Sequence, residues 1–157
     1  MKPRNVAAWL SVPARWYLGV LFVGACLHKI AEPYSFAVDV ATYDILPLGL
    51  VNVTAIVLPW VELAAGVMLL AGVRVRAAAL LVAAMMAAFI AALLIALAKG
   101  LDMSCGCFAS QGAVDDPISF LTVLRDLAWL GLGVLVLAGD RGLLGVERWL
   151  DRRRLQA

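Results

Sequence analysis

The hydrophobic pattern of the chain consists of long, nearly uncharged stretches separated by short polar ones. The clearest stretch covers residues 77–98, where Ala, Leu and Met run without a charged residue between Arg76 and Lys99. A helix needs about 20 largely apolar residues to cross a hydrocarbon core about 30 Å thick, because it rises about 1.5 Å per residue. The stretch 77–98 therefore predicts a membrane-spanning helix.

Three further stretches meet the same requirement. We expect spanning helices at about 13–31, 50–71, 77–98 and 118–138, with outer loops at 32–49 and 99–117 and a tail at 139–157. The second span contains Pro59, which is expected to kink it, and the fourth is the least hydrophobic. Residues 1–157 are thus expected to form one membrane domain, an all-α, polytopic, antiparallel bundle of four transmembrane helices.

The basic residues predict the orientation of this bundle. They are concentrated before or early in the first span, in the turn after the second and in the tail, namely Lys2, Arg4, Arg15, Arg74, Arg76, Arg141, Arg148, Arg152, Arg153 and Arg154. The two outer loops carry mainly acids. Short cytoplasmic loops are enriched in Lys and Arg, so both termini are expected in the cytoplasm. The expected location is the cell inner (plasma) membrane, with the outer loops in the periplasm.

Composition supports a lipid environment and excludes other classes of protein. The chain is 64% hydrophobic and 15% charged, with a mean hydropathy of +0.96. A soluble domain is nearer half apolar and one quarter charged, so the lipid bilayer is the expected partner of the excess apolar surface. The net charge of +2 and the lack of a basic stripe with interleaved aromatic residues exclude nucleic acid as a partner.

The second outer loop contains two cysteines one residue apart, Cys105 and Cys107, separated by Gly106. In an oxidising compartment such thiols can close a small disulfide ring, for which Gly106 supplies backbone freedom, and Phe108 can rest the loop on the bundle. Strain would raise the reduction potential of this bond and favour electron transfer from another dithiol. The pair predicts thiol–disulfide exchange, with a structural bridge, inert thiols or a soft-metal site as alternatives.

Three residues near the outer end of the first span are secondary candidates. Cys26 is expected to be buried packing, and exchange with the loop cysteines is the alternative. His28 and Lys29 are expected to anchor the helix at the interface, where Lys extends toward the headgroups. Their functional alternative is to stabilise a thiolate in the loop above. No metal site is predicted at zinc spacing, because the chain has a single His.

Ionisable residues inside the bundle form a second candidate site. Glu62, Arg125 and Asp126 each cost about 2.5–3.5 kcal/mol at a helix centre and therefore need partners. Adjacent residues point about 100° apart on a helix, which disfavours an Arg125–Asp126 pair. We expect Arg125 to pair with Glu62, and Asp126 to face the first or third span, with Lys29 or water as its partner. The group is either a structural clamp or a proton or quinone site. No cofactor is required, and quinone is the candidate.

These residues together resemble the methylamine utilisation protein MauE family, a branch of the DoxX-like membrane proteins. The resemblance covers most of the chain, and its most specific part is the Cys-Gly-Cys-Phe run, which family members usually continue with Gly where this chain has Ala109. The other matching residues are Arg15, Gly19, Phe22, Gly24, Lys29, Pro59, Trp60, Glu62, Leu63, Gly66, Gly72, Arg74 and Arg76.

The resemblance implies a redox-associated membrane protein that supports maturation of the disulfide-rich small subunit of methylamine dehydrogenase. In the leading hypothesis, Cys105 and Cys107 exchange with a periplasmic client or a thioredoxin-like partner. Glu62, Arg125 and Asp126 then serve a proton or quinone step. The alternatives are a non-catalytic assembly or export factor with a structural disulfide, a quinone-linked DoxX-like electron-transfer subunit, and a soft-metal handler.

Overall fold

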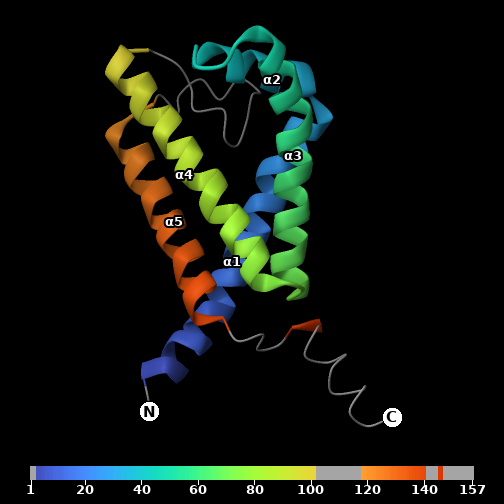
Figure 1. The fold of residues 1–157 in the computed structure, drawn as a ribbon, viewed down its shortest axis with the longest axis vertical. Coiled ribbons are helices and arrows are strands. Elements are labelled where there is room, and N and C mark those ends of the chain that lie inside the picture. Colours follow the sequence, from blue (N-terminus) through green and yellow to red (C-terminus); the bar gives the residue numbers. More distant parts are fainter. Residues whose placement is uncertain (1–2, 102–117, 141–144, 147–157) are drawn as a thin grey trace.

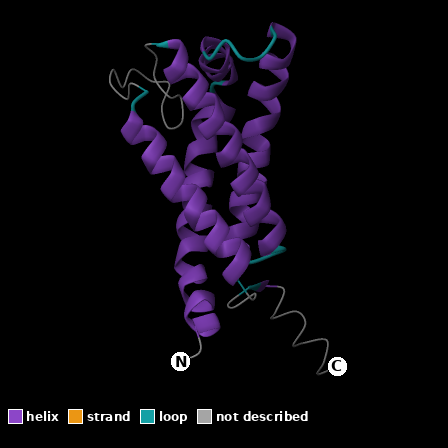
Figure 2. Ribbon diagram, turned by 60° about the vertical axis from the view of Figure 1, so that its left-hand side comes forward, coloured by secondary structure: helices purple, strands orange, loops and turns teal. Residues whose placement is uncertain are grey.

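The described part of the chain folds into five helices. The computed structural model describes residues 3–101, 118–140 and 145–146. In chain order the helices are α1 (Pro3–Ala31), α2 (Pro33–Thr42), α3 (Leu48–Ala71), α4 (Val75–Lys99) and α5 (Phe120–Gly139). Figure 2 shows that the described part of the chain is almost entirely helical, and no strand occurs in it.

Four of these helices are long and apolar enough to cross a membrane, namely Ala7–Ala31 within α1 and the whole of α3, α4 and α5. Figure 1 shows that they alternate in direction, so the start of α1 and the end of α5 lie at one end of the bundle. The short helix α2 lies across the other end, which we call the α2 end. The prediction of an all-α, antiparallel bundle of four spanning helices is confirmed.

The helix limits differ from the expected ones by more than two residues in two places. The first helix begins at Pro3 rather than near Pro13, which lies inside α1 and removes only one backbone donor there. The segment 32–49 was expected to be a loop, but it contains α2. Pro33 occupies the first turn of α2, where its fixed φ favours a helix and its missing N–H has no partner to lose.

The closest packing in the bundle is between α1 and α3, where two glycines face each other. A Cβ added at Gly66 would lie 2.9 Å from Val23 Cγ2 and 3.0 Å from the Gly19 carbonyl oxygen. A Cβ added at Gly19 would lie 3.1 Å from the Gly66 carbonyl oxygen. Small residues allow such close backbone approach, which supplies dispersion contacts where lipid removes the hydrophobic drive for helix association.

A buried ion pair closes the end of the bundle opposite α2. Arg15 Nη1 lies 3.3 Å from Asp140 Oδ2, and the two side chains are 0% and 1% exposed. Gly72 ends α3 with a φ of +68°, and a Cβ there would lie 2.5 Å from Gly145 Cα and 3.3 Å from Arg15 Nη1. Arg15 was expected as a charge beside the cytoplasm, whereas it lies inside the protein and joins α1 to the end of α5.

The segment 102–117 is flanked by two described residues, Leu101 after α4 and Ile118 before α5. Helix α4 ends at Gly100, and Ser119 caps α5 through reciprocal hydrogen bonds with Thr122. Lys99 Nζ donates to the Asp44 carbonyl oxygen at 2.6 Å, which links α4 to the connection between α2 and α3. Leu101 and Ile118 both pack against the apolar cluster that contains Tyr43, the residue that follows α2.

Candidate functional site

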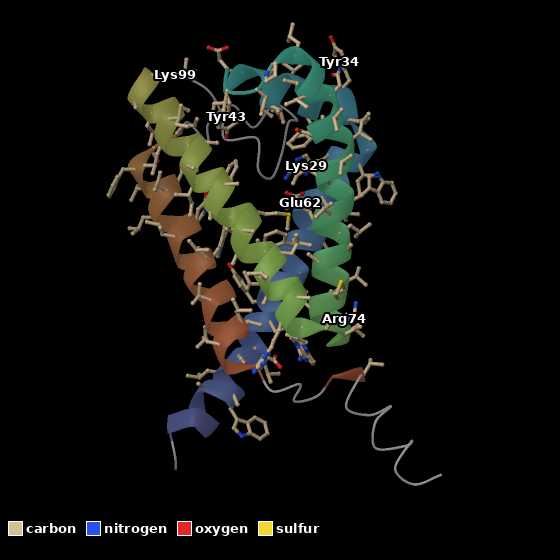
Figure 3. The ribbon with its side chains drawn as sticks, in the orientation of Figure 1. Lys29, Tyr34, Tyr43, Glu62, Arg74 and Lys99 are labelled. Atoms are coloured by element: carbon tan, nitrogen blue, oxygen red, sulfur yellow. The ribbon has the colours of Figure 1, made fainter. Side chains whose placement is uncertain are left out.

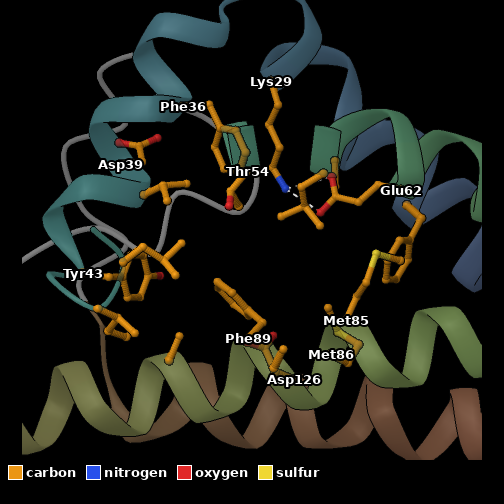
Figure 4. A pocket seen from close by; sticks show the side chains of 18 of the residues that line it. Lys29, Phe36, Asp39, Tyr43, Thr54, Glu62, Met85, Met86, Phe89 and Asp126 are labelled. Atoms are coloured by element: carbon orange, nitrogen blue, oxygen red, sulfur yellow. Dashed lines mark hydrogen bonds and ion pairs between the residues drawn. The ribbon is translucent and has the colours of Figure 1, made fainter. Parts of the chain in front are cut away.

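The described residues enclose a cavity of about 310 Å³ in the half of the bundle nearer α2. All five helices contribute to its walls, which are mostly apolar and include Phe36, Phe89 and the two adjacent methionines Met85 and Met86. Lys29, Asp39, Glu62 and Asp126 also line it. Figure 4 shows Lys29 and Glu62 beside each other, with Asp39 and Asp126 at separate places around the apolar space. The cavity therefore brings together ionisable groups from four helices.

The main polar feature of the cavity is an ion pair between α1 and α3. Lys29 Nζ lies 2.9 Å from Glu62 Oε1 and 3.0 Å from Oε2, so it donates to both carboxylate oxygens. The two side chains are 7% and 10% exposed, and the Lys29 ammonium also lies 4.9 Å from the Phe36 ring centre. A charge pair buried this deeply needs such additional contacts to offset its lost hydration.

The expected pair between Arg125 and Glu62 is wrong. The partner of Glu62 is Lys29, which was expected to extend to the headgroups and is instead buried. The reason is the order of the helices in space, since α3 packs mainly against α1 whereas α5 packs against α1 and α4. Figure 3 shows Lys29 and Glu62 pointing toward each other across the α1–α3 contact.

Arg125 and Asp126 pair with each other, contrary to the expectation from their angular separation. Arg125 Nε donates to Asp126 Oδ1 at 3.2 Å, and its guanidinium lies 4.7 Å from the Trp129 ring centre. The Arg125 side chain is long enough to turn along α5 toward these two residues. The expectation, which used only the angle of about 100° between adjacent residues, did not allow for this length. Asp126 is fully buried and lines the cavity, whereas Arg125 does not. Of the three predicted ionisable residues, Glu62 and Asp126 share one site.

Asp39 is a residue of this site that sequence reasoning missed, because it lies in the segment expected to be a loop. The signal was present, since Phe36, Asp39, Val40 and Tyr43 follow helical spacing and all four line the cavity. Burial raises the pKa of the Asp39 carboxyl above its ordinary value, and the charges of His28 and Lys29 partly oppose this rise.

The cysteines separate into one described residue and one pair outside the description. Cys26 is fully buried in α1, and its thiol donates to the Val23 carbonyl oxygen at 3.1 Å. Cys105, Gly106, Cys107 and Phe108 lie outside the described residues. Half-buried His28 is the neighbour of Lys29 at the end of α1. In the described ranges, no group of three or more His, Cys, Asp or Glu side chains is placed to hold a metal ion.

Comparisons with known proteins agree on one family. The family model "Methylamine utilisation protein MauE" matches residues 7–139. A MauE protein of Paracoccus denitrificans is 36% identical over 126 residues, which cover 80% of this chain and 67% of that protein. A MauE protein of Methylophilus methylotrophus is 29% identical over 135 residues, which cover 85% of this chain and 70% of that protein. No solved structure matches. The chain belongs to the MauE family.

Proposed function

We propose that this chain takes part in methylamine utilisation as a membrane thiol–disulfide carrier. In this proposal Cys105 and Cys107 exchange with a client or a thioredoxin-like partner on the periplasmic side of the inner membrane. The client class suggested by the family resemblance is the disulfide-rich small subunit of methylamine dehydrogenase. The family match supports the pathway, and the Cys-Gly-Cys spacing supports the chemistry.

The observation that carries the proposal is the position of the charged, apolar-walled cavity. Leu101 and Ile118, the described residues on either side of the cysteine segment, pack against the apolar cluster that contains Tyr43, and Tyr43 lines the cavity. A carrier needs an electron acceptor close to its dithiol, and this cavity lies at the end of the bundle where Leu101 and Ile118 are packed. Its location favours electron transfer over a purely structural role for the cysteines.

The residues of the cavity fit a lipid-soluble quinone as that acceptor. A volume of about 310 Å³ lies at the lower end of the range for small-molecule sites, which is about 300–1,000 Å³. Phe36 and Phe89 offer ring contacts, and the Lys29 ammonium and the Thr54 hydroxyl can donate to a carbonyl oxygen. Because the walls are mostly apolar, a ring that enters from lipid suits this space better than a hydrophilic ligand.

The overall reaction balances with these participants. Oxidation of the Cys105–Cys107 dithiol forms one S–S bond and releases two electrons and two protons. Reduction of a quinone to a quinol consumes two electrons and two protons and forms two O–H bonds. Periplasmic client dithiols then reduce the carrier disulfide by exchange, and the client acquires the disulfide.

The decisive experiment compares Cys105→Ser and Cys107→Ser with Cys26→Ser in cells grown on methylamine. We expect client disulfides and growth to be lost with either loop variant and kept with Cys26→Ser. Thiol trapping in graded glutathione buffers should give a carrier potential near or above about −200 mV, the range of exchange catalysts. A bond that resists reduction to about −300 mV, together with growth of the loop variants, would instead indicate an assembly factor with a structural disulfide.

A further inference from the structure

Three carboxylates line the cavity, and they differ in how they are neutralised. Glu62 is paired with Lys29, and Asp126 is paired with Arg125. Asp126 Oδ2 is also buried without a hydrogen-bond partner, but the other oxygen of that carboxylate, Oδ1, accepts from Arg125. Asp39 differs in that neither of its oxygens makes a hydrogen bond or ion pair with any residue in the described ranges, and its Oδ2 atom is buried. A buried carboxylate oxygen without a partner is costly in its charged form, so this carboxyl is suited to hold and release a proton.

Asp39 also lies between the cavity and the outer surface of the protein at α2. It belongs to α2, which is not one of the spanning helices, and the opposite face of α2 carries Tyr34 at 84% and Val38 at 50% exposure. The Asp39 side chain is itself partly exposed, while its Oδ2 atom is buried toward the cavity. Figure 4 shows Asp39 apart from the Lys29–Glu62 pair on the cavity wall.

The charged residues around Asp39 influence the pKa of its carboxyl group. His28 and Lys29 of α1 are the positive charges that act on it, and they favour the carboxylate. Glu62 of α3 and Asp126 of α5 share the cavity and carry the opposite charge, each beside its own cation. Burial is the largest effect on the Asp39 pKa and raises it, so the carboxyl keeps its proton at a pH where an exposed Asp has lost it.

We propose that Asp39 is the proton-transfer residue of the cavity, carrying protons between the water at the α2 surface and a quinone reduced inside the bundle. The inference rests on the proposed function and assigns it a residue that neither the family match nor the sequence motifs identify. Each of the two protons needed to form the quinol O–H bonds leaves the Asp39 carboxyl in turn. Water at the α2 surface returns a proton to Asp39 between the transfers, and the electrons come from the loop dithiol.

The test is a single-turnover assay with the full-length protein in liposomes. The loop cysteines are first reduced, the reductant is removed, and a short-tailed benzoquinone is added across a range of pH. We expect Asp39→Asn to slow quinone reduction about 100-fold with little change in quinone affinity, which is the size of effect typical of a general acid. Asp39→Glu should restore much of the rate with a displaced pH profile, a result that a purely structural role would not give.

Glu32→Gln is the matched control, because Glu32 is an exposed acid next to α2 that does not line the cavity. It should keep the wild-type rate and pH profile. An Asp39→Asn protein with the wild-type rate and profile would overturn this inference and leave the proposed function intact. A wild-type protein that does not reduce the quinone would overturn both. If Asp39→Asn does not fold, an unchanged pH profile in Asp39→Glu would count against the inference.

Discussion

Lys29 Nζ donates to both oxygens of Glu62, at 2.9 and 3.0 Å, and so joins α1 to α3 across the wall of the cavity. Both side chains are at most one tenth exposed. Removing one partner of such a pair leaves a buried, uncompensated charge. Replacing both partners by apolar residues leaves no buried charge. This asymmetry makes the pair testable by a double-mutant cycle.

We expect Lys29→Met to lower the free energy of unfolding by about 3–5 kcal/mol, and Lys29→Met with Glu62→Leu to recover most of that loss. Reversible unfolding in mixed detergent micelles would measure both values. Lys99→Met is the control, because the Lys99–Asp44 pair is 38% and 89% exposed and should contribute about 1 kcal/mol or less. A double variant as unstable as the single one would refute the compensation argument.

The close approach of α1 and α3 predicts a strong difference between two glycines. Gly66→Ala should lower stability by about 1–3 kcal/mol, because its Cβ would lie 3.0 Å from the Gly19 carbonyl oxygen and 3.1 Å from the Val23 nitrogen. Gly24→Ala should cause no loss, since a Cβ there meets nothing within 4 Å. Thermal unfolding of the purified variants would compare them, and equal effects would contradict this packing.

Two helix-ending glycines offer a second matched pair. Gly72 and Gly100 have φ angles of +68° and +67°, so replacement by Ala strains the backbone similarly at both, by about 1–2 kcal/mol. Only Gly72→Ala also forces a Cβ to 2.5 Å from Gly145 Cα and close to Arg15. We therefore expect Gly72→Ala to be clearly the more destabilising in the same unfolding assay. Similar losses of unfolding free energy in the two variants would show that the residues around Arg15 move to accommodate the added Cβ at little cost.

The pH dependence of stability follows from the Asp39 carboxyl. Burial raises its pKa in the folded protein, so the folded state binds more protons than the unfolded state between the ordinary and the raised value. Stability should therefore fall as the pH rises through that window, and the loss should be absent in Asp39→Asn. Unfolding of both proteins from pH 3 to pH 8 would check the slope. If the stability of Asp39→Asn fell more steeply with pH than that of the wild type, the contribution of Asp39 would have the opposite sign to the expected one.

Two neighbouring alanines of α4 test whether the cavity is the acceptor site. Ala88 lines the cavity and Ala87 does not, although both are exposed positions on the helix. Ala88→Leu should fill part of the space and weaken binding of a short-tailed quinone, measured by equilibrium dialysis against liposomes. Ala87→Leu adds the same volume outside the cavity and should bind as the wild type does. Equal binding by both variants would place the quinone elsewhere.

The spanning helices could be predicted from the sequence because the requirement is local. A run such as 77–98 satisfies the length and hydropathy of a membrane helix without knowledge of its neighbours. Helix α2 was missed for a related reason. Its ten residues, Pro33–Thr42, are too few for a span, and its apolar spacing has meaning only once the cavity beneath it is known.

The ion pairs could not be predicted in the same way, since they depend on which helices touch. The separation of about 100° between adjacent side chains made Glu62 a reasonable partner for Arg125, but this angle does not fix the order of the helices around the bundle. The position of α1 against α3 brings Lys29 to Glu62, and the flexibility of Arg125 lets it reach its own neighbour Asp126. A carboxyl such as Asp39 becomes visible only when burial is known atom by atom.

Helix α1 carries two buried cations, Arg15 near its middle and Lys29 near its end, and the partner of each is synthesised later. Lys29 is neutralised by Glu62 of α3, whereas Arg15 depends on Asp140, which follows α5. Because the chain is synthesised from its N-terminus, α1 is made before either of these partners, and Asp140 comes only after the last spanning helix. A chain interrupted before Asp140 would therefore lack the ion pair that closes the end of the bundle opposite α2.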